Sequence, residues 1–258
     1  MKQLNLVAND SQFNIQELAV ELDALLEDAV VLLNQEFASL SLIKGTRAKE
    51  PLPTEPKQFS SYRTRMGIMM EYAVNHYLGK IINNKENNLS LTFVSANQYP
   101  DFFIRNKNLE VKINIEVKAV DADSDEQAAR FDVPTEIIDS EHDLLMLLAW
   151  KWEDLVVDGE IRGERPQVYA HTVVAAGDIA DERDKRLKIT GGKIENGEAY
   201  VFSKKKQVFV LDPGNYGKFW RIVHSSRHEH IHNDSIKRFL LFLEAVSVET
   251  IRKRLSGR

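Results

Sequence analysis

Cysteine is absent from this chain of 258 residues, and several other features are missing with it. Without thiols the sequence excludes disulfide bonds and thiolate metal sites, and it fits a cytoplasmic protein. No apolar run approaches the roughly 18 residues of a membrane helix, so we expect no membrane span. The N-terminus, MKQLNLVANDSQFNIQ, lacks the apolar core and cleavage site of a signal peptide. There is also no glycine-rich phosphate loop, so an ATP-driven activity is not expected.

Charge of one sign is scarce in each half of the chain, although the net charge is only −5. Residues 183–258 hold 17 lysines and arginines against 8 acidic residues, whereas residues 1–182 hold 17 against 31. Such asymmetry points to a polyanionic partner. A basic, solvated C-terminal part is an equally good interpretation of charge alone.

Apolar periodicity predicts helices in the first third of the chain. Apolar residues at three- and four-residue spacing predict an N-terminal helical segment over residues 11–40, either one helix or two in sequence. The connector KGTRAKEPLPTEPKQFSS is rich in proline and follows it. Ser60 or Ser61 is placed to cap a second helix, whose apolar face carries Met66, Met70, Ala73, Tyr77 and Ile81.

The rest of the chain favours strands. LSLTFVSA, DFFIR, LEVKINIEVKAV, DLLMLLAWKWEDLVV, QVYAHTVVAA and QVFVLD are strand-like, and KIENGEAYVF predicts a hairpin around Asn196-Gly197. GDIADERDKRL is a short polar helix or loop, and NDSIKRFLLFLEAVSVETIRKRL is helical. We therefore expect one α/β (α+β) domain over residues 1–258, with a central mixed β-sheet flanked by helices.

The segment YPDFFIRNKNLEVKINIEVKAV contains Glu-Val-Lys twice, at residues 110–112 and 116–118. Side chains alternate along a strand, so the polar residues of this segment share one face and the apolar residues share the core face. The polar set is Glu110, Lys112, Asn114, Glu116 and Lys118; the apolar set is Val111, Ile113, Ile115 and Val117.

The hairpin register decides which copy performs chemistry. Pairing Ile104 with Val111 keeps apolar residues together and places Arg105 opposite Glu110. Asp101 then lies diagonal to Glu116, at roughly 7–8 Å. A register shifted by two would place Asp101 directly opposite Glu116. Since Glu110 has a structural partner in the first register, the second copy is the catalytic candidate.

Two carboxylates and a lysine in this arrangement suit phosphodiester hydrolysis. Mg²⁺ prefers oxygen ligands and usually takes one or two carboxylates plus waters. Asp101, Glu116 and the Val117 carbonyl are the expected ligands. Lys118 is expected to orient the attacking water or to stabilise negative charge in the transition state. The competing interpretation is an exposed amphipathic strand with alternating charges.

Pro100-Asp101, fourteen intervening residues and then Glu116-Val117-Lys118 resemble the PD-(D/E)xK motif of type II restriction endonucleases. In that superfamily the preceding helix often carries a glutamate near the metal, and RTRMGIMMEY offers Glu71. The resemblance implies a restriction-endonuclease-like core and Mg²⁺-dependent hydrolysis of double-stranded DNA, usually by a homodimer. Asp101, Glu116 and Lys118, with Glu71 in support, are the catalytic residues it implies.

The resemblance also implies a biological role. A bacterial, cytoplasmic type II site-specific endonuclease would cleave foreign DNA, while a DNA methyltransferase, as a functional partner, shields the host's own sites. Two alternatives remain open. The chain could be a repair or structure-specific nuclease with the same core, or a non-catalytic DNA-binding protein.

Basic residues elsewhere are candidates for contacts with the DNA backbone. Each of them is equally well explained as a solvated surface side chain. They are Arg63, Arg65, Lys204, Lys205, Lys218, Arg221 and Arg227. The histidines between His224 and His232 could bind a metal or phosphate, but their spacing matches no established metal motif.

Overall fold

The structure is a computed structural model, and it describes residues 1–39, 56–83, 88–94, 99–122, 130–212, 216–223 and 232–246. Its helices are α1 (Lys2–Ala8), α2 (Ile15–Ser39), α4 (Pro56–Ile82), α5 (Ala176–Ile189), α6 (Phe219–Val223) and α7 (Asp234–Ala245), with a 3₁₀ turn at Thr135–Ile137. The strands are β1 (Ser90–Phe93), β2 (Phe102–Arg105), β3 (Val111–Asp121), β4 (Asp143–Val157), β5 (Glu160–Ala175), β6 (Lys193–Glu195), β7 (Glu198–Ser203) and β8 (Val208–Leu211).

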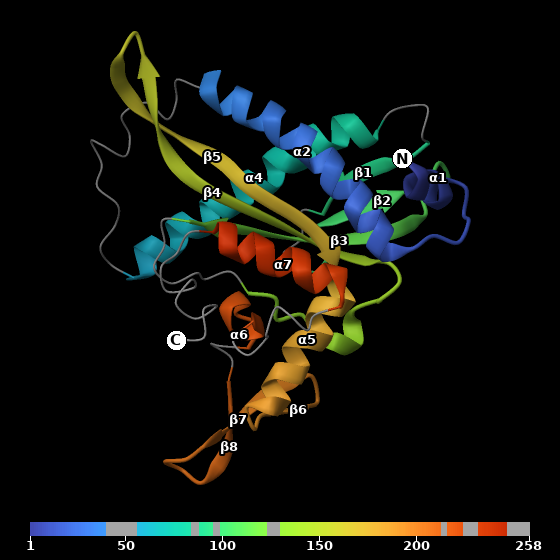
Figure 1. The fold of residues 1–258 in the computed structure, drawn as a ribbon, viewed down its shortest axis with the longest axis vertical. Coiled ribbons are helices and arrows are strands. Elements are labelled where there is room, and N and C mark those ends of the chain that lie inside the picture. The colour runs from blue at the N-terminus through green and yellow to red at the C-terminus, as the bar shows by residue number, and fades with distance from the viewer. Residues whose placement is uncertain are drawn as a thin grey trace.

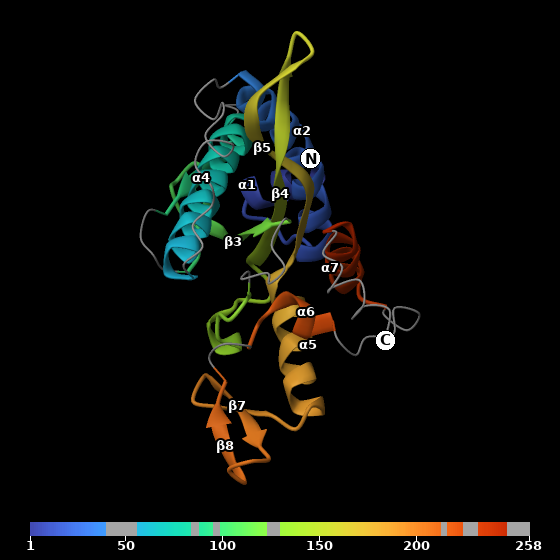
Figure 2. The ribbon, with the colours of Figure 1, turned by 90° about the vertical axis from the view of Figure 1, so that its left-hand side faces the viewer.

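A mixed sheet of five strands forms the centre of the molecule, in the order β1-β2-β3-β4-β5 (Figure 1). Strands β3 and β4 are parallel, and the other neighbouring pairs are antiparallel. Helices cover both faces of this sheet (Figure 2). The expected α+β architecture with a central mixed sheet flanked by helices is confirmed.

Strand β4 forms the middle of the core because its first eight residues are apolar on both faces except at Asp143. Leu144, Met146 and Leu148 pack against the cluster that includes α1, α2 and α4. Leu145 and Leu147 pack on the opposite side, against α5, α6 and α7. A nearly continuous apolar run is what a strand covered on both faces requires.

Two helical expectations change in detail. Residues 15–39 form one helix, α2, and not two. Helix α4 begins at Pro56, so the expected cap at Ser60 or Ser61 is wrong, because both serines lie within the helix. Proline is well suited to the first turn of a helix, where its missing N–H has no partner to lose. The buried face of α4 runs along Met66, Met70, Val74, Leu78 and Ile82, with Ala73, Tyr77 and Ile81 partly buried beside it.

The register of the β2–β3 hairpin differs from our first expectation. Ile104 pairs with Ile113 and not with Val111, and a bulge follows at Arg105. The expected Arg105–Glu110 pair is therefore wrong, and Glu110 instead contacts Lys112 at 2.9 Å. Because side-chain direction repeats every two residues, a shift of two keeps the same residues on the core face, and apolar patterning could not separate the two registers.

A second sheet of three antiparallel strands, β6-β7-β8, stands outside the main body (Figure 2). Asn196 and Gly197 join β6 to β7 with positive φ values of 53° and 75°, which confirms the expected hairpin turn. The polar segment after β5 is helical, as α5. Within the described ranges, no helix is long and apolar enough to cross a membrane.

Candidate active site

The observed register brings Asp101 to the second Glu-Val-Lys. Phe102 pairs with Ile115, so Asp101, one residue earlier, continues the pairing opposite Glu116. The backbone N–H of Val117 donates a hydrogen bond of 2.7 Å to Asp101 Oδ2. The shifted register considered from the sequence is thus the observed one, and it places the two carboxyl groups closer than a diagonal pair would be.

Glu116 is a buried carboxyl group with one oxygen unused. Its side chain lies among the buried residues of β3, only 6% exposed. Oε1 accepts a hydrogen bond from Lys118 Nζ. Oε2 is buried and has no hydrogen-bond partner among the described residues. Since buried polar atoms are nearly always paired, this oxygen marks a place where a cation or a water would be stabilised.

The electrostatics of the cluster follow from burial. Burial raises the pKa of Glu116 to about 7, and the neighbouring Asp101 carboxylate acts in the same direction, while Lys118 opposes both. For Lys118, burial alone would lower the pKa, but the charges of Glu116, Asp101 and Glu71 outweigh it and raise the pKa above its usual value. Lys118 is therefore an ammonium group at neutral pH.

Glu71 reaches this cluster from α4. Burial raises its pKa to about 7, Asp101 and Glu116 raise it further, and Lys118 opposes them. Three carboxyl groups thus interact with a single lysine. When all three are ionised the cluster carries two negative charges in excess, which is the charge that one divalent cation would balance.

The residues present fit a magnesium ion bound by few protein ligands. No group of three His, Asp or Glu side chains in the described part of the chain is placed to hold a metal. Mg²⁺ usually keeps several waters and takes only one or two carboxylates, so Asp101 and Glu116 are a sufficient pair. The unpaired Glu116 Oε2 supports this fit. The contribution of the Val117 carbonyl stays a prediction.

A buried hydrogen-bond network holds the segment that carries Asp101. Asp143, which is fully buried, accepts hydrogen bonds from the Tyr99 hydroxyl, from Asn114 Nδ2 at 2.7 Å and from the Asp139 N–H at 2.9 Å. Burial, and the negative charges of Asp143 and Glu116, raise the pKa of Tyr99 above its usual value, so its hydroxyl stays a donor. Tyr99 is thereby fixed to β3 and β4 two residues before Asp101.

Sequence reasoning missed both ends of this network. Asp143 was included in an apolar strand and received no role of its own. An acid directly before seven apolar residues was the available signal, because a carboxyl group in such a position must be paired. Nothing in the sequence paired it with Tyr99.

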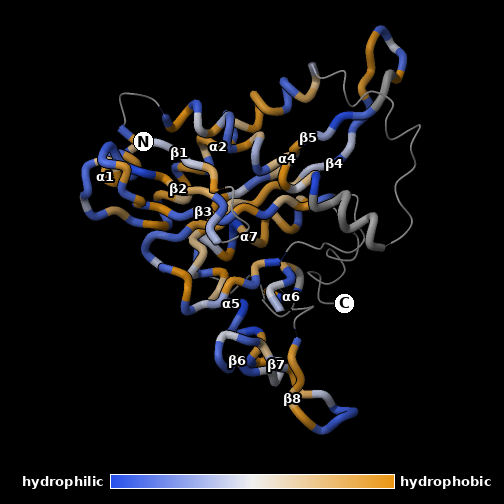
Figure 3. The backbone as a smooth tube through the Cα atoms, turned by 180° about the vertical axis from the view of Figure 1, so that it is seen from behind, coloured by the Kyte–Doolittle hydropathy of each residue, from blue (hydrophilic) through white to orange (hydrophobic). Residues whose placement is uncertain are grey.

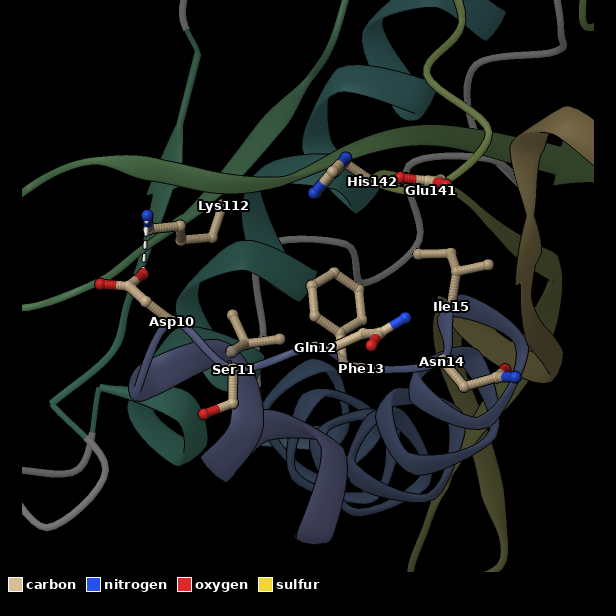
Figure 4. Close-up of a pocket in the computed structure, with 10 residues that line it drawn as sticks. Asp10, Ser11, Gln12, Phe13, Asn14, Ile15, Lys112, Glu141 and His142 are labelled. Carbon is tan, nitrogen blue, oxygen red and sulfur yellow. Dashed lines mark ion pairs between the residues drawn. The ribbon is translucent and has the colours of Figure 1, made fainter.

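The first Glu-Val-Lys has a structural role. Lys112 Nζ contacts Asp10 at 2.7 Å and Glu110 at 2.9 Å. Lys112 also lines an open cavity of about 450 Å³, beside the connection between α1 and α2, together with His142 and Phe13 (Figure 4). Glu116 and Lys118 do not line this cavity. The two copies of the motif are thus committed to different surroundings.

The candidates for DNA contact are not drawn into the carboxylate cluster by any described contact. Arg65 is exposed on α4, and Lys204 and Lys205 are exposed in the turn between β7 and β8. Lys218 is half-buried, and Arg221 contacts Asp212 at 3.3 Å. The side chains of Arg63 and Arg227, and the histidines from His224 to His230, lie outside the described residues.

Comparison with protein-family models, with curated proteins and with solved structures finds no match to this chain. The functional argument therefore depends on the geometry of the site.

The pKa of Glu71 makes stability depend on pH. Its pKa is about 7 in the folded chain, against an ordinary value of 4.5. Between these values the folded chain binds more protons than the unfolded chain, so the free energy of unfolding falls as pH rises through this window. In EDTA, we expect Glu71→Gln to remove part of this fall and to be more stable than wild type by about 1–3 kcal/mol at pH 8, as measured by urea denaturation.

Glu110→Gln is the matched control, since Glu110 is exposed and its contacts with Lys112 and Asn106 lower its pKa. That variant should gain no stability at pH 8. An unchanged pH slope in Glu71→Gln would contradict the placement of Glu71 among the carboxylates.

The Tyr99–Asp143 hydrogen bond predicts a second stability effect. Tyr99→Phe leaves the buried Asp143 carboxylate with one donor fewer, which should cost about 1–3 kcal/mol in the free energy of unfolding. Tyr72→Phe serves as the control, because Tyr72 is 61% exposed and its replacement should change stability by less than about 0.5 kcal/mol. Equal stability of the two variants would remove the network from the account.

Proposed function

We propose that this chain is a Mg²⁺-dependent DNA endonuclease whose hydrolytic site is formed by Asp101, Glu116 and Lys118. The observation that carries the proposal is the buried Glu116 carboxyl group, with Lys118 on one oxygen and no partner on the other. A strand that was merely amphipathic and solvated would leave this arrangement unexplained, since an unpaired buried oxygen is costly. The match of these residues to the PD-(D/E)xK pattern supports the same function.

Each residue has a distinct task in the proposed reaction. Asp101 and Glu116 would hold the metal, and Glu71 adds negative charge that favours a divalent ion over a monovalent one. When bound, Mg²⁺ supplies Lewis acidity toward a phosphate oxygen and lowers the pKa of a coordinated water. Lys118, as an ammonium group, donates hydrogen bonds to the negative charge that develops on the phosphoryl group.

The protonation of Lys118 separates the two roles considered from the sequence. An amine with a raised pKa is a poor acceptor of the water's proton at neutral pH, so charge stabilisation is the better role. Burial strengthens this effect, because an ammonium group acts over a low local dielectric constant.

The first candidate within this class is a type II restriction endonuclease. It would cut double-stranded DNA at a specific sequence as a homodimer, whose two-fold symmetry matches a palindromic site, with a DNA methyltransferase as functional partner. The second candidate is a repair or structure-specific nuclease. The exposed Phe202 and Phe209 on the outer sheet favour this second candidate, because aromatic side chains stack on unpaired bases.

The doubled motif provides a matched pair of variants. Purified protein incubated with phage DNA should cut it in Mg²⁺ and not in EDTA. Lys118→Ala should lower the cleavage rate by about 10²–10³-fold, because it removes a donor to the transition state. Lys112→Ala removes the same side chain from the first Glu-Val-Lys and should keep the rate close to that of wild type.

The products distinguish the two candidates. Discrete bands indicate sequence-specific cleavage, and a smear, or preference for branched DNA, indicates the repair class. DNA left uncut across varied substrates and divalent metals, or equal loss of activity in both lysine variants, would contradict the proposed function.

A further inference from the structure

The outer sheet β6-β7-β8 is the part of the molecule that the hydrolytic site leaves unexplained. Neither core cluster includes a described residue of its three strands. Its contact with the main body runs through β6 and α5. A three-stranded sheet needs an apolar face packed on something to be stable. The question is therefore what covers this sheet.

One face of the outer sheet is apolar and open. Tyr200 pairs with Leu211, and Phe202 pairs with Phe209, so these four side chains lie on the same face. We call this set the aromatic face. Phe202 is 46% exposed, and Phe209 and Leu211 are each 44% exposed. The two phenylalanine rings are in edge contact, 5.5 Å between centroids. Hydrophobic positions continue along β8 well away from the main core (Figure 3).

Positive charge accompanies the aromatic face. Lys204, Lys205 and Lys206 are exposed in the turn at its outer end, beside Phe202 and Phe209. Lys193 Nζ lies 5.0 Å from the centre of the Phe209 ring. The acids of this sheet, Glu195 and Glu198, flank the turn at its other end and are bound by Lys193 and by the Tyr200 hydroxyl.

This combination matches one class of partner. Unpaired bases expose flat rings that stack on aromatic side chains, and their phosphates require cations a few ångströms away. A base-paired duplex already uses its base faces for stacking, so it cannot cover an aromatic face in the same way. A second copy of the chain would bring three more lysines against these three, which like-charge repulsion opposes.

We propose that the aromatic face and the turn Lys204–Lys206 bind single-stranded DNA. Bases stack on Phe202 and Phe209, and phosphates lie against the three lysines. The choice of DNA over other nucleic acids rests on the proposed function. If the chain is a nuclease, its substrate then contains unpaired nucleotides near the cut, which makes structure-specific cleavage the better of the two candidate activities.

The test uses the full chain in EDTA, where no cleavage occurs, and a fluorescein-labelled oligonucleotide of about 20 thymidines. Anisotropy should show binding that weakens with salt. Phe202→Leu together with Phe209→Leu keeps an apolar face but removes the rings, and should weaken binding about 10- to 100-fold. Replacing Lys204, Lys205 and Lys206 by alanine should weaken binding and reduce the salt slope by about 2, at 0.7 per phosphate.

The control is Val156→Ala with Val157→Ala, at the tip of the β4–β5 hairpin. These valines are also exposed, 57% and 44%, but have no aromatic neighbours on their strands' outer end, and their replacement should leave affinity unchanged. Thermal unfolding of each variant shows that the main body still folds. Phe202→Tyr with Phe209→Tyr should retain affinity, because tyrosine stacks as phenylalanine does.

Three results would overturn the proposal. The wild-type chain could bind no single strand, the leucine variant could bind as tightly as wild type, or sedimentation could show that the leucine variant loses a dimer while keeping strand affinity. In the last case a second copy covers the aromatic face. A chain that binds the strand through this face but cuts no DNA in Mg²⁺ would contradict the proposed nuclease and leave this inference standing.

Discussion

The burial of the Glu116 carboxyl group is the constraint on which the site depends. A carboxylate placed inside a protein is strongly destabilised unless a partner compensates it, and here Lys118 compensates one oxygen only. The Asp101 and Glu71 carboxyl groups add negative charge and increase the imbalance. Such a cluster is most stable when a cation completes it, and this links the architecture of the strand to metal-dependent chemistry.

The fold supplies that constraint by pairing β2 with β3 in a particular register. The Val117 N–H donates to Asp101, and this hydrogen bond takes the place of a further ladder contact at the end of β2. Asp143 reinforces the same position from β4 by accepting the Tyr99 hydroxyl. The carboxyl groups are thus held by backbone and buried side chains and not by long surface side chains, so their geometry costs little entropy to maintain.

Composition and periodicity predicted much of the architecture. Strand β4 matches its apolar run at both ends, because covered strands leave a continuous signal. The Asn196-Gly197 turn was predictable because few residues adopt positive φ. The short helix α1 was not predicted. Seven residues carry too little periodicity, and Leu4 and Val7 are stabilised by burial beside α2.

The site was predictable in part, for a physical reason. Spacing and residue type identified Asp101, Glu116 and Lys118 as candidates, and the structure brings them together with Glu71. The register could not be predicted, since two registers separated by two residues keep the same side chains buried. The Tyr99–Asp143 contact joins residues far apart in the sequence, and no local pattern signals such a pairing.

The outer sheet gives the molecule a second surface with different physics. The carboxylate site is buried and negative, whereas the aromatic face is exposed and bordered by lysines. A polyanion cannot approach three carboxylates unless cations reduce the repulsion, so binding by a separate basic surface would complement a metal-dependent site. The charge asymmetry along the chain has a structural counterpart in this separation.

The central claim is that Asp101 and Glu116 hold a divalent cation. Anomalous diffraction from a crystal grown with Mn²⁺, which takes the same oxygen ligands as Mg²⁺, tests it without any assay of activity. The account predicts an anomalous peak within about 2.0–2.3 Å of oxygens from both carboxylates, absent in a Glu116→Gln crystal. Full binding of Mn²⁺ elsewhere, with no peak between Asp101 and Glu116, would contradict it.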